Sequence, residues 1–377
     1  MRLFVVKTIA AKTIVFFYCM KTYRVLFTIK MFKERGKPMK NRGLILTIIV
    51  LFATLIITFV FEIGRTSNVE EANTGNENKT VGILQYVSHP ALNEIRQGVV
   101  DGLEENGYTE GKNLTIEYQN GQADQSKLET MSQQLVQDTP DALVGIATPA
   151  AQSLANTTED IPTVLGAVTD PVGANLVDDM DEPGGNLTGV SDKAPVDQQM
   201  ELAQELLPEA EKVGILYSST EDNSKYQVAE ATEEAEKAGY QVEDYPVPSA
   251  NEITQTVQTM GDEVDMIYIP LDNTIANAMP TVVNEANKKD IPIIPSVDSM
   301  VEQGGLATIG VNQYDLGMKS GEMLADILDG NANPATTPIY TFDTGDVIVN
   351  KEQAEELNIE LPESVTDEAT YVEEEDE

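Results

Sequence analysis

The sequence is poor in the residues that most often carry out catalysis or bind metals. Its 377 residues contain one cysteine, Cys19, one histidine, His89, and no tryptophan. A single cysteine excludes an intramolecular disulfide and a cysteine-based metal site, and a single histidine excludes a site built from several histidines. A catalytic triad would have to use His89, and no nucleophile motif accompanies it. We therefore expect no enzymatic activity, no metal and no cofactor.

Basic residues are scarce beyond the N-terminal part of the chain. Residues 1–65 hold 12 of the 24 lysines and arginines but only 2 of the 63 acidic residues, so 12 basic and 61 acidic residues remain in the rest. A chain this acidic repels phosphate groups, and we expect no nucleic-acid partner. Its length is sufficient for two medium-sized domains.

One long apolar run lies near the N-terminus. Gly43–Phe61 is nineteen residues long and carries no charge, which is enough to span the hydrocarbon layer of a membrane. Several lysines and arginines precede it, so the positive-inside rule places the N-terminus in the cytoplasm and the main part of the chain outside. We interpret the run as an uncleaved signal-anchor, and a cleaved signal peptide that would release a secreted protein is the alternative.

The flanks of this run differ in composition. Met39 begins a stretch typical of the basic start of a signal sequence, so we expect translation to start there. Polar residues follow the run and indicate a flexible tether. The expected divisions are a basic cytoplasmic leader over residues 1–42, a transmembrane or signal helix over 43–61, a tether over 62–79 and an acidic tail over 363–377.

From Thr80 onward, short apolar runs alternate with amphipathic stretches. Such alternation with short connections predicts an α/β fold with parallel sheets, and the pattern restarts after residue 191, which predicts two doubly wound lobes facing a cleft. The segment 184–190 closes the first block, and Gly184–Asn186 within it is interpreted as a turn. The expected strands cover residues 81–86, 114–118, 142–146, 163–167, 212–217, 241–245, 265–269, 291–294 and 307–311. The expected helices cover residues 90–106, 126–137, 149–156, 198–206, 225–238, 252–260, 275–288 with an interruption at Pro280, and 316–328.

Polar residues follow several of the expected strands, at the edge of a parallel sheet where ligands bind. Thr148, with Ser219 or Ser224, lies near a helix N-terminus, which favours a ligand carboxylate. Asp272 is a candidate acceptor for a ligand ammonium group. Helix caps and turns explain each of these residues equally well when taken singly. His89 is either a residue at the entry to a helix or a hydrogen-bonding partner of the ligand or of the facing loop.

Six ordered segments resemble a known family. They are Ile83–Pro90, Gly145–Gln152, Thr169–Leu176, Gly184–Ser191, Ser218–Ser224 and Asp272–Thr274. Together they resemble the ABC transporter substrate-binding proteins that include tryptophan- and tyrosine-binding members, over about Lys79 to Pro362. The resemblance implies a type I periplasmic-binding fold with three crossovers, in which residues 80–191 and 312–333 form one lobe and residues 192–311 and 334–362 form the other.

The resemblance also implies a function. Hinge closure near Ser191 and Val311 would capture a small amino acid, aromatic or otherwise apolar, for a membrane permease with an ATPase. Many relatives carry a lipid-modified cysteine after the leader, and we expect the membrane helix to replace it here. We expect an extracytoplasmic, monomeric protein, and the alternatives are a ligand-sensing module for a membrane receptor or kinase and an enzyme on the same architecture. The implied ligand contacts are Ser88, Thr148, Ala150, Ala151, Gln152, Thr169, Asp170, Ser219, Asn223, Ser224, Asp272, Asn273 and Ser296.

Overall fold

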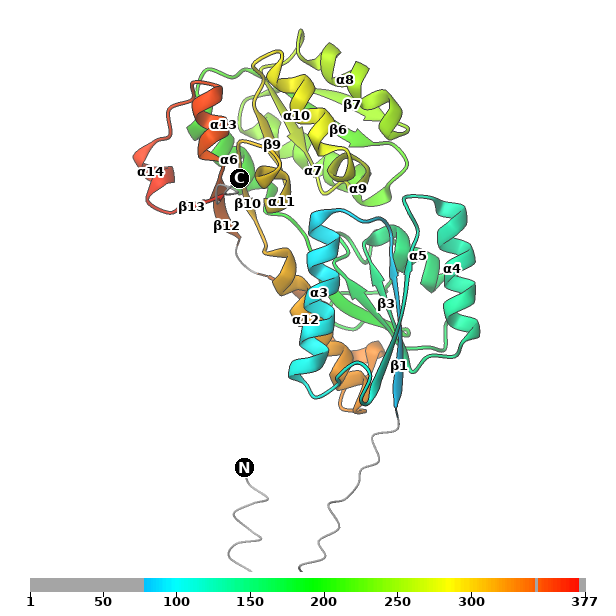
Figure 1. The fold of residues 1–377 in the computed structure, drawn as a ribbon. Helices are drawn as coiled ribbons and strands as arrows, with labels where there is room; N and C mark the ends of the chain where they lie inside the picture. Colours follow the sequence, from blue (N-terminus) through cyan, green and yellow to red (C-terminus); the bar gives the residue numbers. More distant parts are fainter. Residues whose placement is uncertain (1–77, 343–344, 373–377) are drawn as a thin grey trace, which may run out of the picture. The chain divides into compact units, whose positions relative to one another are not determined.

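A computed structural model describes residues 78–342 and 345–372 of the chain, which form two α/β lobes (Figure 1). The predicted leader and membrane helix, and the tether as far as residue 77, lie outside these residues. Within the described ranges, no helix is long and apolar enough to cross a membrane.

The first lobe is built on a six-stranded sheet whose neighbouring strands all pair in parallel. The strand order is β11-β5-β4-β3-β1-β2. The five residues of β3 are all buried, as the uninterrupted apolar run predicts for a central strand. The strands are β1 (Lys79–Gln85), β2 (Leu114–Asn120), β3 (Ala142–Ile146), β4 (Thr163–Gly166), β5 (Leu187–Ser191) and β11 (Tyr340–Thr341).

Helices cover both faces of this sheet, with α3 and α12 on one face and α4 and α5 on the other (Figure 1). Leu92, Ile95, Val99 and Leu103 are buried on α3 at helical spacing and pack into the core of the lobe. The helices are α3 (Pro90–Glu105), α4 (Gln125–Gln137), α5 (Thr148–Ala155) and α12 (Gln313–Leu328).

The second lobe carries a four-stranded parallel sheet in the order β7-β6-β8-β9 and a three-stranded sheet in the order β10-β12-β13. Pro280 lies at the start of α10, which confirms the predicted interruption of the helix over residues 275–288. The strands are β6 (Lys212–Ser218), β7 (Gln241–Val247), β8 (Met266–Ile269), β9 (Ile293–Pro295), β10 (Ala307–Gly310), β12 (Asp346–Val349) and β13 (Thr370–Tyr371). The helices are α6 (Val196–Leu206), α7 (Asp222–Lys237), α8 (Ile253–Met260), α9 (Asn273–Asn277), α10 (Met279–Asn287), α11 (Asp298–Glu302), α13 (Lys351–Glu356) and α14 (Glu363–Thr366).

The strand order of each lobe has one topological switch point. In the first lobe, β1 lies between β2 and β3, so the loops after β1 and β3 leave in opposite directions. In the second lobe, β6 lies between β7 and β8 and creates the same arrangement. Ligands of open α/β sheets bind at such points, outside the carboxyl ends of the strands.

Three features of the fold differ from the sequence prediction. Residues 187–191, to which no strand was assigned, form the buried strand β5, because Gly189 interrupts the short run of strand-forming residues. Strand β11 still pairs with β5, so the chain leaves the first lobe after residue 341 and not at residue 334. Strand β12 pairs with β10 in antiparallel orientation, whereas parallel pairing was expected throughout.

The segment predicted as an acidic tail begins as part of the second lobe. Residues 363–366 form helix α14, and Val365 is buried in the core of this lobe. Strand β13 pairs with β12. The predicted start of the tail at residue 363 is therefore wrong, because a single apolar side chain and two residues of strand pairing hold this acidic stretch to the lobe.

Candidate functional site

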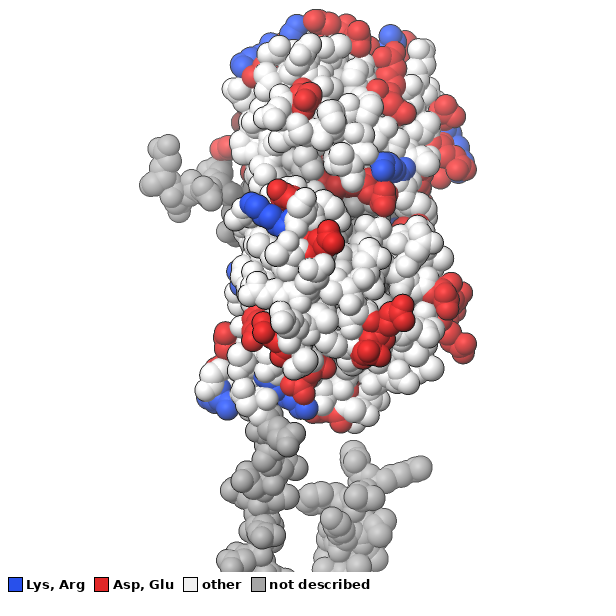
Figure 2. Space-filling view, turned by 90° about the vertical axis from the view of Figure 1, so that its right-hand side faces the viewer, with Lys and Arg blue, Asp and Glu red and all other residues white. Residues whose placement is uncertain are grey.

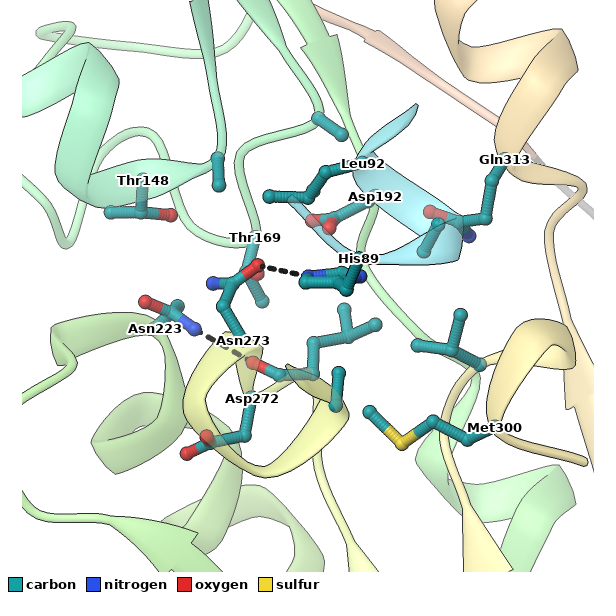
Figure 3. Close-up of a pocket in the computed structure, with 16 residues that line it drawn as sticks. His89, Leu92, Thr148, Thr169, Asp192, Asn223, Asp272, Asn273, Met300 and Gln313 are labelled. Carbon is teal, nitrogen blue, oxygen red and sulfur yellow. Dashed lines mark hydrogen bonds between the residues drawn. The ribbon is translucent and has the colours of Figure 1, made fainter. Parts of the chain in front are cut away.

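A pocket lies where the switch points of the two lobes face each other (Figure 3). The cavity between its walls measures about 30 Å³, which is well below the usual volume of a small-molecule site. Both lobes and the crossover after β5 contribute to it. The residues lining it are His89, Ala91, Leu92, Ala147, Thr148, Ala167, Thr169, Asp192, Asn223, Leu271, Asp272, Asn273, Ala276, Val297, Met300 and Gln313.

Two alanines at the pocket hold an unfavourable backbone conformation. Ala147 follows β3 with a φ of 73°, and Ala167 follows β4 with a φ of 62°. Residues other than glycine seldom adopt this left-handed region, and such strain is concentrated at functional sites. The turn at Ala147 leads directly into α5, so Thr148 begins that helix at the pocket wall.

His89 joins the two lobes across the pocket. Its Nε2 atom lies 3.2 Å from Oδ1 of Asn273, which begins α9 in the second lobe. Burial lowers the pKa of the His89 imidazole to about 4, and the hydrogen bond to Asn273 offsets only part of this effect. The ring is therefore neutral at physiological pH. The sequence left open a hydrogen bond from His89 to the facing loop, and the structure confirms it.

Asp192 is half-buried and places one buried carboxylate oxygen at the pocket. It follows β5 directly, and its Oδ1 atom is buried with no hydrogen-bond partner among residues 78–342 and 345–372. Burial raises the pKa of this carboxyl to about 6, and a hydrogen bond from Thr169 opposes the rise. Figure 3 shows the carboxylate beside Leu92 and His89. A buried, unpaired acceptor of this kind favours a positively charged donor.

Asp272 also lines the pocket, but hydrogen bonds within its own lobe use both of its carboxylate oxygens. Oδ1 accepts from the backbone N–H of Ile275 at 2.8 Å and so caps α9. Oδ2 accepts from the Ser218 N–H and the Ser224 hydroxyl, each at 2.6 Å. Burial, and then the nearby Glu221 carboxylate, raise the pKa of Asp272 to about 7. Figure 3 shows its carboxylate directed away from His89.

Five of the predicted contact residues line the pocket together. They are Thr148, Thr169, Asn223, Asp272 and Asn273.

The other eight predicted contact residues lie elsewhere. Ser224 is buried against Asp272, and Ser296 is buried 2.9 Å from the Tyr268 hydroxyl. Ala150 and Ala151 are buried in the cores of the first lobe. The polar group of each remaining side chain bonds outside the pocket lining: Ser88 to Asn93, Asp170 to the N–H of Gly173, Ser219 to the carbonyl of Val247, and Gln152 to Asp222 across the lobes.

The predicted contact list omits several lining residues, of which Asp192 is the most consequential. The signal that could have found it was the strand immediately before it, since a residue at the carboxyl end of a strand is a candidate for the site. That position was missed because no strand was predicted over residues 187–191. The apolar wall residues Leu92 and Met300 gave no signal, because apolar residues on helices are usually core residues.

Comparisons with known proteins agree with this architecture. The family profile of the ABC transporter substrate-binding proteins matches residues 80–373. A tyrosine-binding protein of Clostridioides difficile strain R20291 is 35% identical over 294 residues, which cover 78% of this chain and 85% of that protein.

Two solved structures are similar to this chain in both sequence and fold. The ABC domain from Streptococcus pneumoniae, solved in complex with L-Trp, is 51% identical with a TM-score of 0.76 and covers 78% of this chain and 99% of that one. A ligand-free, open substrate-binding protein with adhesive properties from Clostridium difficile is 38% identical with a TM-score of 0.61, over 78% and 99% of the two chains. The structure is thus nearer to the L-Trp complex than to the open form, as the bonds between its lobes also indicate.

Two lobes, each containing a parallel sheet, enclose a pocket at their switch points, and the neighbouring structures share the overall fold. With a family match that spans residues 80–373, this chain belongs to the ABC transporter substrate-binding protein family and has its type I periplasmic-binding fold.

Proposed function

We propose that this protein binds an aromatic amino acid between its lobes and releases it unchanged. The observation that carries the proposal is the buried, unpaired Oδ1 of Asp192 in the pocket between the lobes. L-Trp in the complex of the 51% identical relative supports the ligand class, as does the tyrosine-binding relative. The pocket is lined by both apolar and polar side chains. Its lining residues include no nucleophile paired with a base, which supports binding without catalysis.

The two ends of an amino acid match different parts of the pocket. Its ammonium group would bind to Asp192, and this proposal replaces the predicted role of Asp272, whose oxygens already accept three hydrogen bonds. Its carboxylate would bind at the first turn of α5, where the Thr148 hydroxyl points toward the pocket in Figure 3. Leu92, Ala276 and Met300 provide apolar contacts for the side chain of the ligand.

Capture would require the lobes to move apart and close again. The His89–Asn273 and Gln152–Asp222 hydrogen bonds would break on opening and form again on closure. The closed protein, a monomer on the outer side of the membrane, would then dock on a permease with a cytoplasmic ATPase. We propose that the apolar run at residues 43–61, outside the described residues, anchors it there.

A thermal-shift panel of the twenty amino acids tests the ligand class. A ligand that binds only the folded protein raises its melting temperature, by the equivalent of about 2.7 kcal/mol at a hundred times the dissociation constant. We expect aromatic amino acids to give the largest shifts and calorimetry to give a single site. A flat panel would refute the proposal, and product formation during incubation would refute simple binding.

A further inference from the structure

Glu221 fixes the orientation of the Asn273 amide at the pocket. Glu221 is buried, and its two oxygens accept hydrogen bonds from Asn223, Asn273 and Thr274. Among them is the bond from Nδ2 of Asn273 to Oε2 of Glu221 at 2.7 Å. Each oxygen of Glu221 already accepts a hydrogen bond from a backbone N–H, of Asn273 or of Thr274, so the amide nitrogen of Asn273 and not its oxygen faces Glu221. The amide oxygen of Asn273 then faces His89.

This orientation determines which nitrogen of His89 carries the proton. An amide oxygen only accepts, so Nε2 of His89, 3.2 Å from Oδ1 of Asn273, must be the donor. A neutral imidazole carries one proton, and Nδ1 is therefore a bare acceptor. Nδ1 of His89 is buried and has no hydrogen-bond partner within the described part of the chain. The hydrogen-bonding character of Nδ1 thus depends on a carboxylate in the opposite lobe.

Asn223 presents a second acceptor by the same logic. Its Nδ2 atom donates to the carbonyl of Leu271 at 2.7 Å, which leaves Oδ1 as the free end of the amide. Oδ1 of Asn223 is buried and has no hydrogen-bond partner among the described residues, and the same holds for Oδ1 of Asp192. His89 belongs to the first lobe, Asp192 to the crossover and Asn223 to the second lobe. All three line the pocket. Each of their unpartnered atoms accepts hydrogen bonds, and none donates.

We propose that His89 is a specificity-determining residue and that Glu221 is the positioning residue that fixes its tautomer, so that the pocket selects ligands carrying a hydrogen-bond donor besides the ammonium group. This inference rests on the proposed function. Among aromatic amino acids, tryptophan has an indole N–H and tyrosine a phenol O–H, whereas phenylalanine has neither. A ligand without that donor leaves Nδ1 of His89 unpaired and desolvated, which corresponds to about a tenfold to hundredfold loss of affinity.

The tautomer is measurable without any ligand. His89 is the only histidine in the sequence, so 15N NMR of tag-free, histidine-labelled protein reports on this ring alone. We expect Nε2 to be protonated and Nδ1 to be unprotonated near neutral pH. Glu221→Gln would let the Asn273 amide turn, since the new side chain can both donate and accept, and would shift both 15N signals toward a mixture of tautomers. Glu129→Gln, an exposed change on α4, is the matched control.

Calorimetry tests the selectivity. We expect L-tryptophan or L-tyrosine to bind at least about ten times more tightly than L-phenylalanine and O-methyl-L-tyrosine. His89→Phe keeps an aromatic ring but removes both ring nitrogens, and with them the Nδ1 acceptor, so it should bring the affinities for tyrosine and phenylalanine together. Glu221→Gln should also reduce the ratio of the affinity for tyrosine to that for phenylalanine, although Glu221 acts on His89 only through Asn273.

The outcomes separate this inference from the proposed function. A protonated Nδ1 in the wild-type protein, or equal affinity for phenylalanine and its hydroxylated counterpart, overturns the inference and leaves amino-acid binding intact. If no amino acid binds, the proposed function and the selectivity both fail, while the NMR result still decides the tautomer. An unprotonated Nδ1 whose 15N signal shifts on addition of tyrosine, but not of phenylalanine, supports the inference directly.

Discussion

At the scale of single residues, the pocket depends on which buried polar atoms already have partners. Asp272 and Asp192 both line the pocket; Asp272 is buried, and Asp192 is half-buried with one buried oxygen. Asp272 holds α9, the Ser218 N–H and Ser224 together, while Asp192 keeps one oxygen unpaired. A buried acceptor without a partner is costly to the free protein, and a ligand donor removes that cost on binding. This difference identifies Asp192 as the better partner for a charged donor.

Replacing Asp192 by asparagine should therefore weaken the binding of an aromatic amino acid by at least about tenfold, because a hydrogen bond to a charged group is lost. Isothermal titration calorimetry would measure the change. Asp346→Asn, an exposed substitution on β12, is the control and should leave the dissociation constant unchanged. Wild-type affinity in Asp192→Asn would show that the ammonium group binds elsewhere.

The raised pKa of Asp192, about 6, predicts a dependence of binding on pH. The ammonium group favours the ionised carboxylate, so a proton on Asp192 competes with the ligand. Affinity should be nearly constant above about pH 7 and fall about tenfold by about pH 5, since each pH unit below the pKa reduces the ionised fraction about tenfold. The dissociation constant measured across this range would follow that curve. A wild-type dissociation constant that does not change with pH would contradict the role of Asp192 as the ammonium partner. The dissociation constant of Asp192→Asn should not change with pH over this range.

The same pKa shift predicts the effect of Asp192 on stability without ligand. Its folded-state pKa lies above the unfolded value, so the folded protein holds the proton more tightly and becomes less stable as the pH rises through about 6. Asp192→Asn should therefore raise the free energy of unfolding by about 1 to 2 kcal/mol near pH 8, with little effect near pH 4. Urea unfolding at both pH values would measure this, and a loss of stability near pH 8 would contradict it.

At the scale of elements, the contact between α3 and α12 depends on glycine. A Cβ atom added at Gly98 would lie 2.2 Å from the carbonyl oxygen of Tyr314, and one at Gly317 would lie 2.1 Å from that of Ile95. These are backbone atoms, so no side-chain rotation can relieve the overlap. Because α3 begins directly after His89, this packing also fixes the position of the pocket wall.

Gly98→Ala should destabilise the protein by about 1 to 3 kcal/mol, the usual cost of overpacking, despite the better helix propensity of alanine. The free energy of unfolding from urea denaturation would report it. Gly185→Ala is the matched control, because no atom lies within 4 Å of its added Cβ, and it should change stability by less than about 0.5 kcal/mol. Equal effects from both variants would refute close helix packing as the cause.

At the scale of the whole molecule, acidic charge dominates the surface. Acidic side chains are spread over the face shown in Figure 2, with few basic ones among them. Residues 66–377 hold 61 acidic and 12 basic residues. Like charges at this density repel one another and oppose the compact state, and dissolved salt screens that repulsion.

The melting temperature at about pH 8 should therefore rise by several degrees when sodium chloride is increased from about 10 mM to about 500 mM. Differential scanning calorimetry would measure it. Near pH 4, where many carboxylates are protonated, the same addition of salt should have a much smaller effect. A melting temperature that is unaffected by salt at about pH 8 would show that local ion pairs balance the net charge.

The sequence by itself determined the alternation of strands and helices, and with it the two-lobed α/β fold, because apolar periodicity is a local property. The sequence also allowed five polar residues to be assigned to one pocket, because the carboxyl ends of parallel strands meet at one edge of a sheet. Elements held by few residues, such as β11 and β13, left no comparable pattern.

Only the tertiary structure decided the roles of the pocket residues. Asp192 and Asp272 are the same residue type at similar positions, and what distinguishes them is whether distant groups such as the Ser218 N–H and Ser224 reach their oxygens. The protonated nitrogen of His89 likewise follows from Glu221, which lies in the other lobe. Hydrogen-bond partners far apart in sequence are fixed by packing, and no local pattern encodes them.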